Sequence, residues 1–222
     1  MESISPGHDH DHDALLTRAV NGDQVALNQL FTQHQERLKR MVRLRMDRRL
    51  QGRVDASDVV QEAMISAYSR LKECASEPTM DFFLWLRWIT AEKLMNTHRE
   101  HLGTKKRDVS QEVALYRRPM PEACSVSLAQ QLLGQLTSPT KAVARAEMQL
   151  LVQDVLNSMD AVDREILVLR NFEQLSNAET AEALGIKRST ASKRYISALK
   201  RLKQTLSSIP GIGDDSRLNQ TK

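Results

Sequence analysis

Residues that could bind a nucleic acid are concentrated between Lys187 and Lys203. This stretch holds seven lysines or arginines and no acidic residue. Guanidinium and ammonium groups neutralise phosphates, and together with serine hydroxyls they can hydrogen-bond base edges in the major groove. On a helix, the residues that share the polar face are Arg188, Ser189, Ser192, Lys193 and Ser197, flanked by Arg194, Lys200 and Arg201.

The residues before this stretch predict the element that positions it. Ser176 followed by Glu179 has the spacing of a capping box, which starts a short helix. Gly185 tolerates the positive φ of a tight turn, and small alanines allow a second helix to approach closely. The pattern therefore predicts a DNA-binding helix-turn-helix, with a purely structural helical hairpin as the alternative. The stripe expected to be buried on the second helix is Ala191, Tyr195, Ala198, Leu199, Leu202 and Leu206.

Composition favours an all-α protein whose charge is clustered. Of the 222 residues 41% are hydrophobic and 4% aromatic, and glycines (8) and prolines (6) are scarce. Alternating β-branched runs are hard to find, which argues against sheets. The net charge is only +4, yet residues 36–53 hold eight basic and two acidic residues. Two basic clusters in separate segments favour contact with a polyanion over two solvated helix faces.

The chain is expected to form two small helical domains joined by a flexible linker. Asp13, Asp55 with Ser57, and Asp160 are candidate N-caps, and the expected linker is rich in proline, glutamine and serine. The predicted division is a disordered tail over 1–13, a helical domain over 14–101, a linker over 102–146, a second helical domain over 147–208 and a tail over 209–222. The apolar stripes expected in the first domain are Val25, Leu27, Leu30, Phe31, Leu38 and Val42, then Val60, Ala63, Met64, Ala67 and Leu71.

Several functional classes are disfavoured. Cys74 and Cys124 are too few for a disulfide framework and are expected to be free thiols. The "HDHDHD" run near the N-terminus fits a solvated tail better than a metal site. Neither a Gly-rich phosphate loop nor a nucleophile–base pair is present, so we expect no enzyme, no cofactor and no metal. With no apolar run long enough for a membrane helix and no signal peptide, a cytoplasmic location is expected.

Two segments resemble a known family. "DASDVVQEAMISAYSRL" resembles the region 2 signature of bacterial RNA polymerase sigma factors, and "FLWLRWITAEKLMNTHREH" looks like the promoter-melting segment that follows it. "MDAVDREILVLR" before the helix-turn-helix resembles region 4. The order and spacing, without region 3, are similar to extracytoplasmic-function (ECF, group IV) sigma factors. The segments "GRVDASDVVQEA" and "FEQLSNAETAEALGIKRSTASKRYISALKRL" together look most like the planctomycete type.

The resemblance implies core RNA polymerase as a partner, through its β′ clamp helices and β flap. In the family the region 2 helix docks on the β′ clamp helices. The matching exposed positions here are Asp58, Gln61 and Glu62, which follow one another at i, i+3 and i+4. An anti-sigma factor is a further partner that many relatives have.

The resemblance also implies promoter DNA as a partner. Family members hold the unpaired −10 strand with the end of the melting helix and the loop before it. Trp85 and Trp88 in that helix fit core packing better than base stacking. The positions matching the −10 segment are Lys93, Asn96, Thr97, Arg99 and His101. Those matching the −35 reading helix are Arg188, Ser189, Thr190, Ser192, Lys193 and Arg194.

The implied function is a sigma factor that directs promoter-specific transcription initiation and aids promoter melting. The alternative is a helix-turn-helix regulator that acts without polymerase, with residues 14–101 as a sensing or dimerisation domain.

Overall fold

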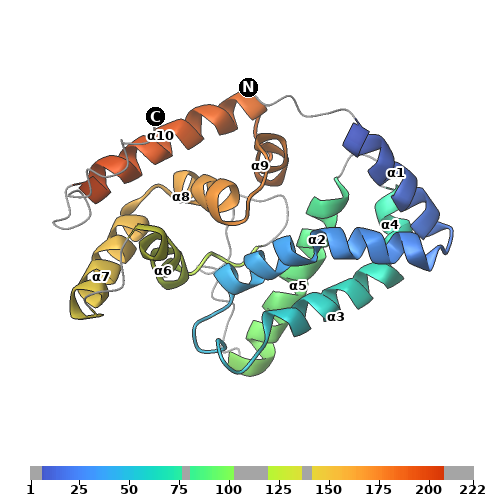
Figure 1. Ribbon diagram of the computed structural model, residues 1–222, viewed down its shortest axis with the longest axis horizontal. Coiled ribbons are helices and arrows are strands. Elements are labelled where there is room, and N and C mark those ends of the chain that lie inside the picture. Colours follow the sequence, from blue (N-terminus) through green and yellow to red (C-terminus); the bar gives the residue numbers. More distant parts are fainter. Residues whose placement is uncertain (1–6, 77–80, 103–119, 137–141, 208–222) are drawn as a thin grey trace, which may run out of the picture.

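The computed structural model describes residues 7–76, 81–102, 120–136 and 142–207. In this part of the chain the backbone is helical and contains no strand, which confirms the all-α fold (Figure 1). A π-helical turn, η2, directly continues α8. The elements are α1 (Gly7–Val20), α2 (Gln24–Arg45), α3 (Ala56–Ser69), α4 (Leu71–Ser76), α5 (Phe82–Leu102), α6 (Ser125–Leu136), α7 (Ala142–Ser158), α8 (Ala161–Leu167), η2 (Val168–Phe172), α9 (Asn177–Leu184) and α10 (Arg188–Ser207).

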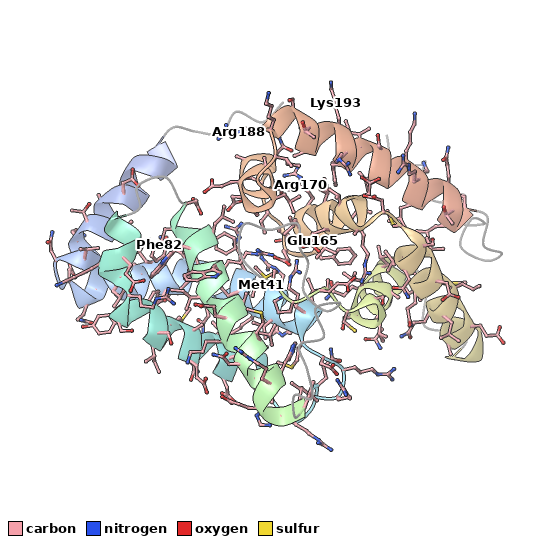
Figure 2. All side chains as sticks on the ribbon, turned by 180° about the vertical axis from the view of Figure 1, so that it is seen from behind. Met41, Phe82, Glu165, Arg170, Arg188 and Lys193 are labelled. Carbon is pink, nitrogen blue, oxygen red and sulfur yellow. The ribbon has the colours of Figure 1, made fainter. Side chains whose placement is uncertain are left out.

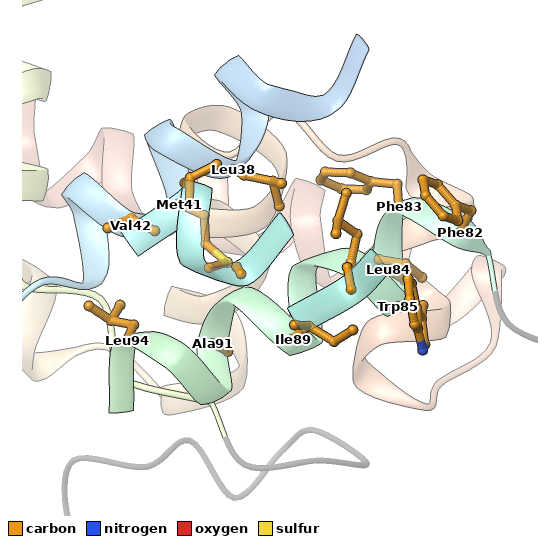
Figure 3. Packing of buried hydrophobic residues seen from close by; sticks show 14 of the residues in the cluster. Leu38, Met41, Val42, Phe82, Phe83, Leu84, Trp85, Ile89, Ala91 and Leu94 are labelled. Atoms are coloured by element: carbon orange, nitrogen blue, oxygen red, sulfur yellow. The ribbon is translucent and has the colours of Figure 1, made fainter. Parts of the chain in front are cut away.

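Helices α1 to α5 form the N-terminal domain, in which α2 and α3 pack against α5. Asp23 caps α2 by accepting hydrogen bonds from two backbone N–H groups. Asp55 caps α3, as predicted, by accepting one from Ser57 N–H. Each cap satisfies donors that a helix start would otherwise leave open. Figure 3 shows Leu38, Met41 and Val42 of α2 among the apolar side chains of α5.

Two expectations for this domain are wrong. Helix α1 begins at Gly7, so Asp13 lies inside the helix and does not cap it; residues 1–6 and the side chains of residues 7–12, including most of the histidine–aspartate run, lie outside the described part. Val25 was expected in the apolar stripe of α2, but its side chain is 64% exposed. Ala26 and Leu27 in the same turn are buried, so the stripe already faces the core there and Val25 lies outside it. The other stripe residues are buried or half-buried.

Helices α6 to α10 form the C-terminal domain. The sequence predicts a linker over 102–146, but residues 120–136 are ordered, and α6 packs on α7 with Leu128, Ala129 and Leu133 buried. The weak helical pattern "SLAQQLLGQL" becomes a stable helix because α7 covers its apolar face. Residues 103–119, 137–141 and 208–222, which hold the rest of the expected linker and the C-terminal tail, lie outside the described part.

The helix-turn-helix forms as predicted. Ser176 and Glu179 make both hydrogen bonds of the capping box at the start of α9, and Gly185 ends α9 in the left-handed region at φ 66°. Ala191, Ala198, Leu202 and Leu206 of α10 are buried as expected. Leu199, in contrast, is 36% exposed, because it lies beside rather than on the stripe that faces α8.

The two domains pack directly on each other. Four apolar residues of the C-terminal domain belong to the same buried cluster as the core of α2, α3 and α5: Ile166, Leu169, Leu175 and Leu184. The segment before α6 also bonds to α2, where Cys124 N–H donates to Leu44 C=O over 2.8 Å. Helix α2 runs through the middle of the molecule, with α10 along one edge and α3 along the opposite edge (Figure 1).

Candidate nucleic-acid interface

The outer face of α10 carries most of the side chains predicted to contact the −35 element. Arg188, Ser189, Thr190 and Lys193 are exposed, and Ser192 is half-buried. Figure 2 shows Arg188 and Lys193 projecting outward, away from the rest of the molecule. The small buried Ala191 and Ala198 hold the opposite face close to the domain core.

The start of α10 is fixed against α9. The Asn177 side-chain amide donates to Arg188 C=O over 3.0 Å, and Ile186 N–H donates to Ala181 C=O over 2.9 Å. The first bond joins the first turn of α9 to the first turn of α10, and the second closes the C-terminal end of α9 at the Gly185 corner. The geometry is that of a helix whose N-terminal half is presented to a partner by a rigid second helix, as in major-groove readers.

Arg194 occupies a different environment from its neighbours. One of its guanidinium nitrogens bonds Asp163 at 3.1 Å and Asp160 at 3.3 Å, while Arg201 bonds Asp163 at 2.7 Å. Asp160 also caps α8, as predicted. Arg194 therefore ties α10 to the start of α8 in this structure, although the resemblance predicts it to be a DNA contact.

The C-terminal half of α5 gathers the residues predicted for the −10 strand. Arg99 and His101 are exposed, and Lys93, Asn96 and Thr97 are half-buried. Thr97 Oγ1 donates to Lys93 C=O over 3.0 Å, and the Arg99 guanidinium hydrogen-bonds the Asn96 side-chain oxygen. Together they give a polar surface with donors for bases and phosphates.

The α2–α3 connection is held against this end of α5 by His98. Asp47 N–H donates to His98 Nε2 over 3.1 Å, so the ring is neutral at that nitrogen. Burial lowers the pKa of His98 below its usual value, and the positive charge of Arg49 adds to this, while Asp47 opposes it. The bond brings the exposed Arg48 and Arg49 next to the α5 surface, a proximity that the sequence did not indicate.

The two tryptophans of α5 lie on the core side. Trp85 is almost completely buried, which confirms its predicted packing role. Trp88 is half-buried and packs against the core, with the Arg70 guanidinium carbon 4.6 Å from its ring centroid. Arg70 also bonds Glu92 over 2.8 Å. In this conformation neither ring is a free stacking platform.

Helix α3 presents an exposed face opposite its buried stripe. Asp58, Gln61 and Glu62 are exposed on it, as predicted. Sequence reasoning missed two large apolar side chains on the same face, Ile65 (71% exposed) and Tyr68 (53% exposed). Their spacing of four and seven residues from Gln61 was the available signal. An acidic surface that also exposes apolar side chains suits a protein partner.

The basic segment 36–53 was expected to contact a polyanion, but its most buried arginine faces the C-terminal domain. Arg45 Nε donates to Glu173 Oε1 over 2.7 Å, and its other nitrogens bond the carboxylate of Glu165 and the Pro121 C=O. Arg87 Nε donates to the second Glu173 oxygen over 2.8 Å. All four charged side chains are buried.

This network satisfies its charges internally. Burial alone would raise the pKa of Glu173, but the charges and hydrogen bonds of Arg45 and Arg87 outweigh it and hold that pKa below its ordinary value. Two arginines and two glutamates balance in formal charge. The network is therefore a neutral, buried contact between the domains and not an anion site.

A second ion pair lies at the edge of the same contact. Arg37 donates to Glu179 over 2.7 Å, and its guanidinium carbon lies 3.6 Å from the centroid of the Phe83 ring. Burial raises the pKa of Glu179, but its bonds to the Ser176 N–H and to Arg37 lower it further than burial raises it. Glu182 on the next turn of α9 accepts from Asp81 N–H over 3.2 Å.

Cys74 and Cys124 are free thiols, as predicted. Among the residues that the structure describes, no three His, Cys, Asp or Glu side chains come together as metal ligands. No helix within the described ranges is both long and apolar enough to cross a bilayer.

Comparisons with known proteins agree with the resemblance. The family model described as "ECF sigma factor" matches residues 10–208. The RNA polymerase sigma factor NccH of Alcaligenes xylosoxydans xylosoxydans is 28% identical over 201 residues, which cover 88% of this chain and 95% of that protein. The ECF RNA polymerase sigma-E factor of Haemophilus influenzae is 25% identical over 198 residues, covering 87% and 94%.

A solved structure shares the fold. CnrH, in complex with the cytosolic domain of CnrY, superposes with a TM-score of 0.50 at 22% sequence identity, covering 87% of this chain and 96% of that one. Similarity at this identity concerns the fold, and the sequence relatives carry the comparison of function.

Proposed function

The chain belongs to the ECF sigma factor family. We propose that three of its surfaces each carry one part of sigma factor function: the outer face of α10, the C-terminal end of α5 and the exposed face of α3. As a sigma factor it directs RNA polymerase to promoters. The observation that carries the proposal is the outward face of α10, where Arg188 and Lys193 stand exposed on a rigid helix-turn-helix.

Helix α10 reads the −35 element in this proposal. Arg188, Ser189, Ser192 and Lys193 reach base edges and the flanking phosphates, and Thr190 contacts the backbone. Because its guanidinium is held by α8, Arg194 contributes by orienting α10 and reaches DNA only if its ion pairs break.

The end of α5 holds the unpaired −10 strand. Arg99 and His101 are exposed for phosphates, and Lys93, Asn96 and Thr97 line the adjoining surface. Arg48 and Arg49 lie next to it through the His98 bond and add positive charge on the same side.

The exposed face of α3 binds core polymerase. Asp58, Gln61 and Glu62 supply polar contacts, and Ile65 and Tyr68 supply the apolar area that a protein interface needs at its centre. This face lies on the opposite edge of the molecule from α10, so one chain can bind polymerase and DNA together (Figure 1).

The protein acts in the cytoplasm in this proposal, as a regulator without an active site of its own. The amino-acid sequence "GRVDASDVVQEA" supports assignment to the planctomycete-like type. CnrH was solved with the cytosolic domain of CnrY, and a comparable anti-sigma protein is a proposed partner here.

Run-off transcription tests the proposal. Core RNA polymerase is mixed with the pure chain and genomic fragments, and the transcripts are mapped. We expect discrete start sites that share −35 and −10 sequences and vanish when the chain is omitted. Absence of transcripts, together with tight binding of a palindromic operator without polymerase, would instead support a self-sufficient helix-turn-helix regulator.

A further inference from the structure

The outer face of α10 carries a large apolar side chain among its cations. Ile196 is 62% exposed. It follows Lys193 by three residues and Ser189 by seven, and at roughly 3.6 residues per turn its side chain leaves the helix about 20° from that of Ser189. Ala198, two residues further along, is fully buried on the opposite face. Ile196 therefore belongs to the surface that the proposed function places in the major groove.

The neighbours of Ile196 suit DNA better than a protein partner. Of the residues one turn away on α10, Ser192, Lys193 and Lys200 are polar, and Leu199 lies on the flank nearer the buried stripe. Helix α10 contains no acidic residue. A protein interface needs a cluster of apolar anchors at its centre, whereas lysines and hydroxyls contact phosphates and base edges. Ile196 is therefore an apolar side chain within a DNA-binding surface.

The chemistry of isoleucine restricts which base it can face. Its side chain has no donor or acceptor, and in the major groove every base presents polar groups, to which thymine alone adds an apolar one, the C5-methyl. Beside any other base, Ile196 would exclude water from a donor or acceptor and leave it unpaired, which costs free energy. Beside thymine, the two apolar groups bury each other, which is favourable. The same side chain thus favours thymine and disfavours the other bases.

We propose that Ile196 is a specificity-determining residue, which selects thymine at one base pair of the −35 element by packing on its C5-methyl group. This inference rests on the proposed function, because it requires α10 to lie in the major groove. Ile196 lies about 10 Å from Ser189 along the helix axis, at roughly 1.5 Å per residue. For a helix that follows the groove, the selected thymine lies about three base pairs from the base that faces Ser189, at roughly 3.4 Å per base pair.

Removing one methyl group from the DNA tests this role. A promoter mapped by run-off transcription is randomised in its −35 region and synthesised once with thymine and once with uracil, which pairs identically but lacks the C5-methyl. Holoenzyme made from core RNA polymerase and the full chain selects from both libraries. We expect the native chain to prefer thymine at one position by about fourfold, the effect of burying one methyl group, and to lose this preference with uracil. A native chain that prefers uracil as strongly as thymine, or that prefers neither at any position, would overturn the inference.

Substitution of Ile196 links the effect to this side chain. Ile196→Ala should show no thymine preference at that position in either library, whereas the exposed Gln204→Ala, two turns further along α10, is the matched control and should keep it. Because Ile196 is exposed, the variant should keep the urea midpoint and the core affinity of the native chain. An alanine variant that is folded and still prefers thymine over uracil would overturn the inference.

A methyl group added to cytosine gives the converse test. With cytosine at the selected position, 5-methylcytosine places a methyl group at the same site in the groove. The native chain should bind it about fourfold more tightly than cytosine, and equal binding would overturn the inference even if Ile196→Ala did not fold. A −35 sequence without any methyl-dependent position would refute the role of Ile196 alone. Selection of no −35 sequence from either library would instead refute DNA reading by α10, and the role of Ile196 with it.

Discussion

Arg45 and Glu173 are 128 residues apart in the sequence, yet Arg45 Nε donates to Glu173 Oε1 over 2.7 Å in a contact closed to solvent. One residue lies at the end of α2 and the other just after η2. The bond joins the N-terminal domain to the C-terminal domain. Its strength depends on complete pairing, because either charge left alone in the same place would have no water to stabilise it.

Removing one member of this network should therefore be strongly destabilising. Arg45→Met keeps much of the side-chain volume but leaves Glu165 and Glu173 with too few cations, and we expect a loss of about 3–5 kcal/mol in the free energy of unfolding. Urea denaturation followed by circular dichroism measures it. Arg49→Met is the matched control, since Arg49 is exposed and its ion pair is with Asp47, two residues away, and it should leave the midpoint nearly unchanged. Equal effects of the two substitutions would contradict the assignment.

Local elements of this fold could be predicted from the sequence, whereas the contact between its domains could not. The capping box at Ser176, the turn at Gly185 and the cap at Asp55 are encoded within four residues, and all three form as expected. The exposed face of α3 follows from helical periodicity in the same way. Each of these features depends on neighbours in the chain.

The partners of the basic cluster depend instead on residues far along the chain. In the sequence, Arg37 and Arg45 look the same as the exposed Arg43 and Arg48, since all belong to one run of cations. Only packing against the C-terminal domain distinguishes them. The same holds for α6, whose short apolar pattern is ambiguous until α7 covers it, and for Arg194, whose acidic partners lie more than thirty residues earlier.

Gly185 should be more tolerant of asparagine than of alanine. Its φ of 66° lies in the left-handed region, where a Cβ costs about 1–2 kcal/mol, although asparagine enters this region more readily. Gly185→Ala should therefore lower the free energy of unfolding by about 1 kcal/mol or more and reduce promoter binding, because the corner sets the angle of α10. Gly185→Asn should cost less in both measurements. Denaturation and footprinting of the holoenzyme compare them, and an asparagine variant worse than alanine would contradict this reading of the turn.

His98 should make the stability of the N-terminal domain depend on pH. Its folded-state pKa is lowered by burial, so the unfolded chain takes up the proton first as the pH falls. Neutral His98 makes its full contribution to the free energy of unfolding above the unfolded-state pKa of about 6.5. This contribution is lost as the pH falls toward the lower folded-state pKa. His98→Gln keeps an acceptor for Asp47 N–H but does not titrate. Urea midpoints measured between about pH 8 and pH 5.5 should fall more for the native chain than for the variant; parallel curves would show that His98 has no such role.

The exposed face of α3 should carry core binding without carrying stability. Asp58→Ala with Gln61→Ala should weaken the complex with core polymerase while binding of isolated promoter DNA persists. Ile65→Ser and Tyr68→Ser should each cost about 2 kcal/mol, or roughly 30-fold in Kd, if they are buried anchors of the interface. Fluorescence anisotropy with labelled core polymerase measures the affinity. The exposed Ser69→Ala on the same helix is the control, and unchanged affinity in Ile65→Ser and Tyr68→Ser would place the interface elsewhere.

The outer face of α10 should carry promoter selection without core binding. Arg188→Ala removes a guanidinium that can donate twice to one base, so it should cost about 1–3 kcal/mol at a single promoter position and relax the preference there. Lys193→Ala should lower transcription from all promoters alike and reduce the slope of log affinity against log salt by about 1, if it contacts a phosphate.

Gln204→Ala, near the far end of α10, is the matched control. Holoenzyme binding to a promoter library at several salt concentrations separates the two behaviours, and a variant that loses core affinity in the same proportion as promoter affinity would refute the division between α3 and α10. The denaturation midpoint of each variant is measured alongside, so that only coupled loss in a folded variant counts against the division.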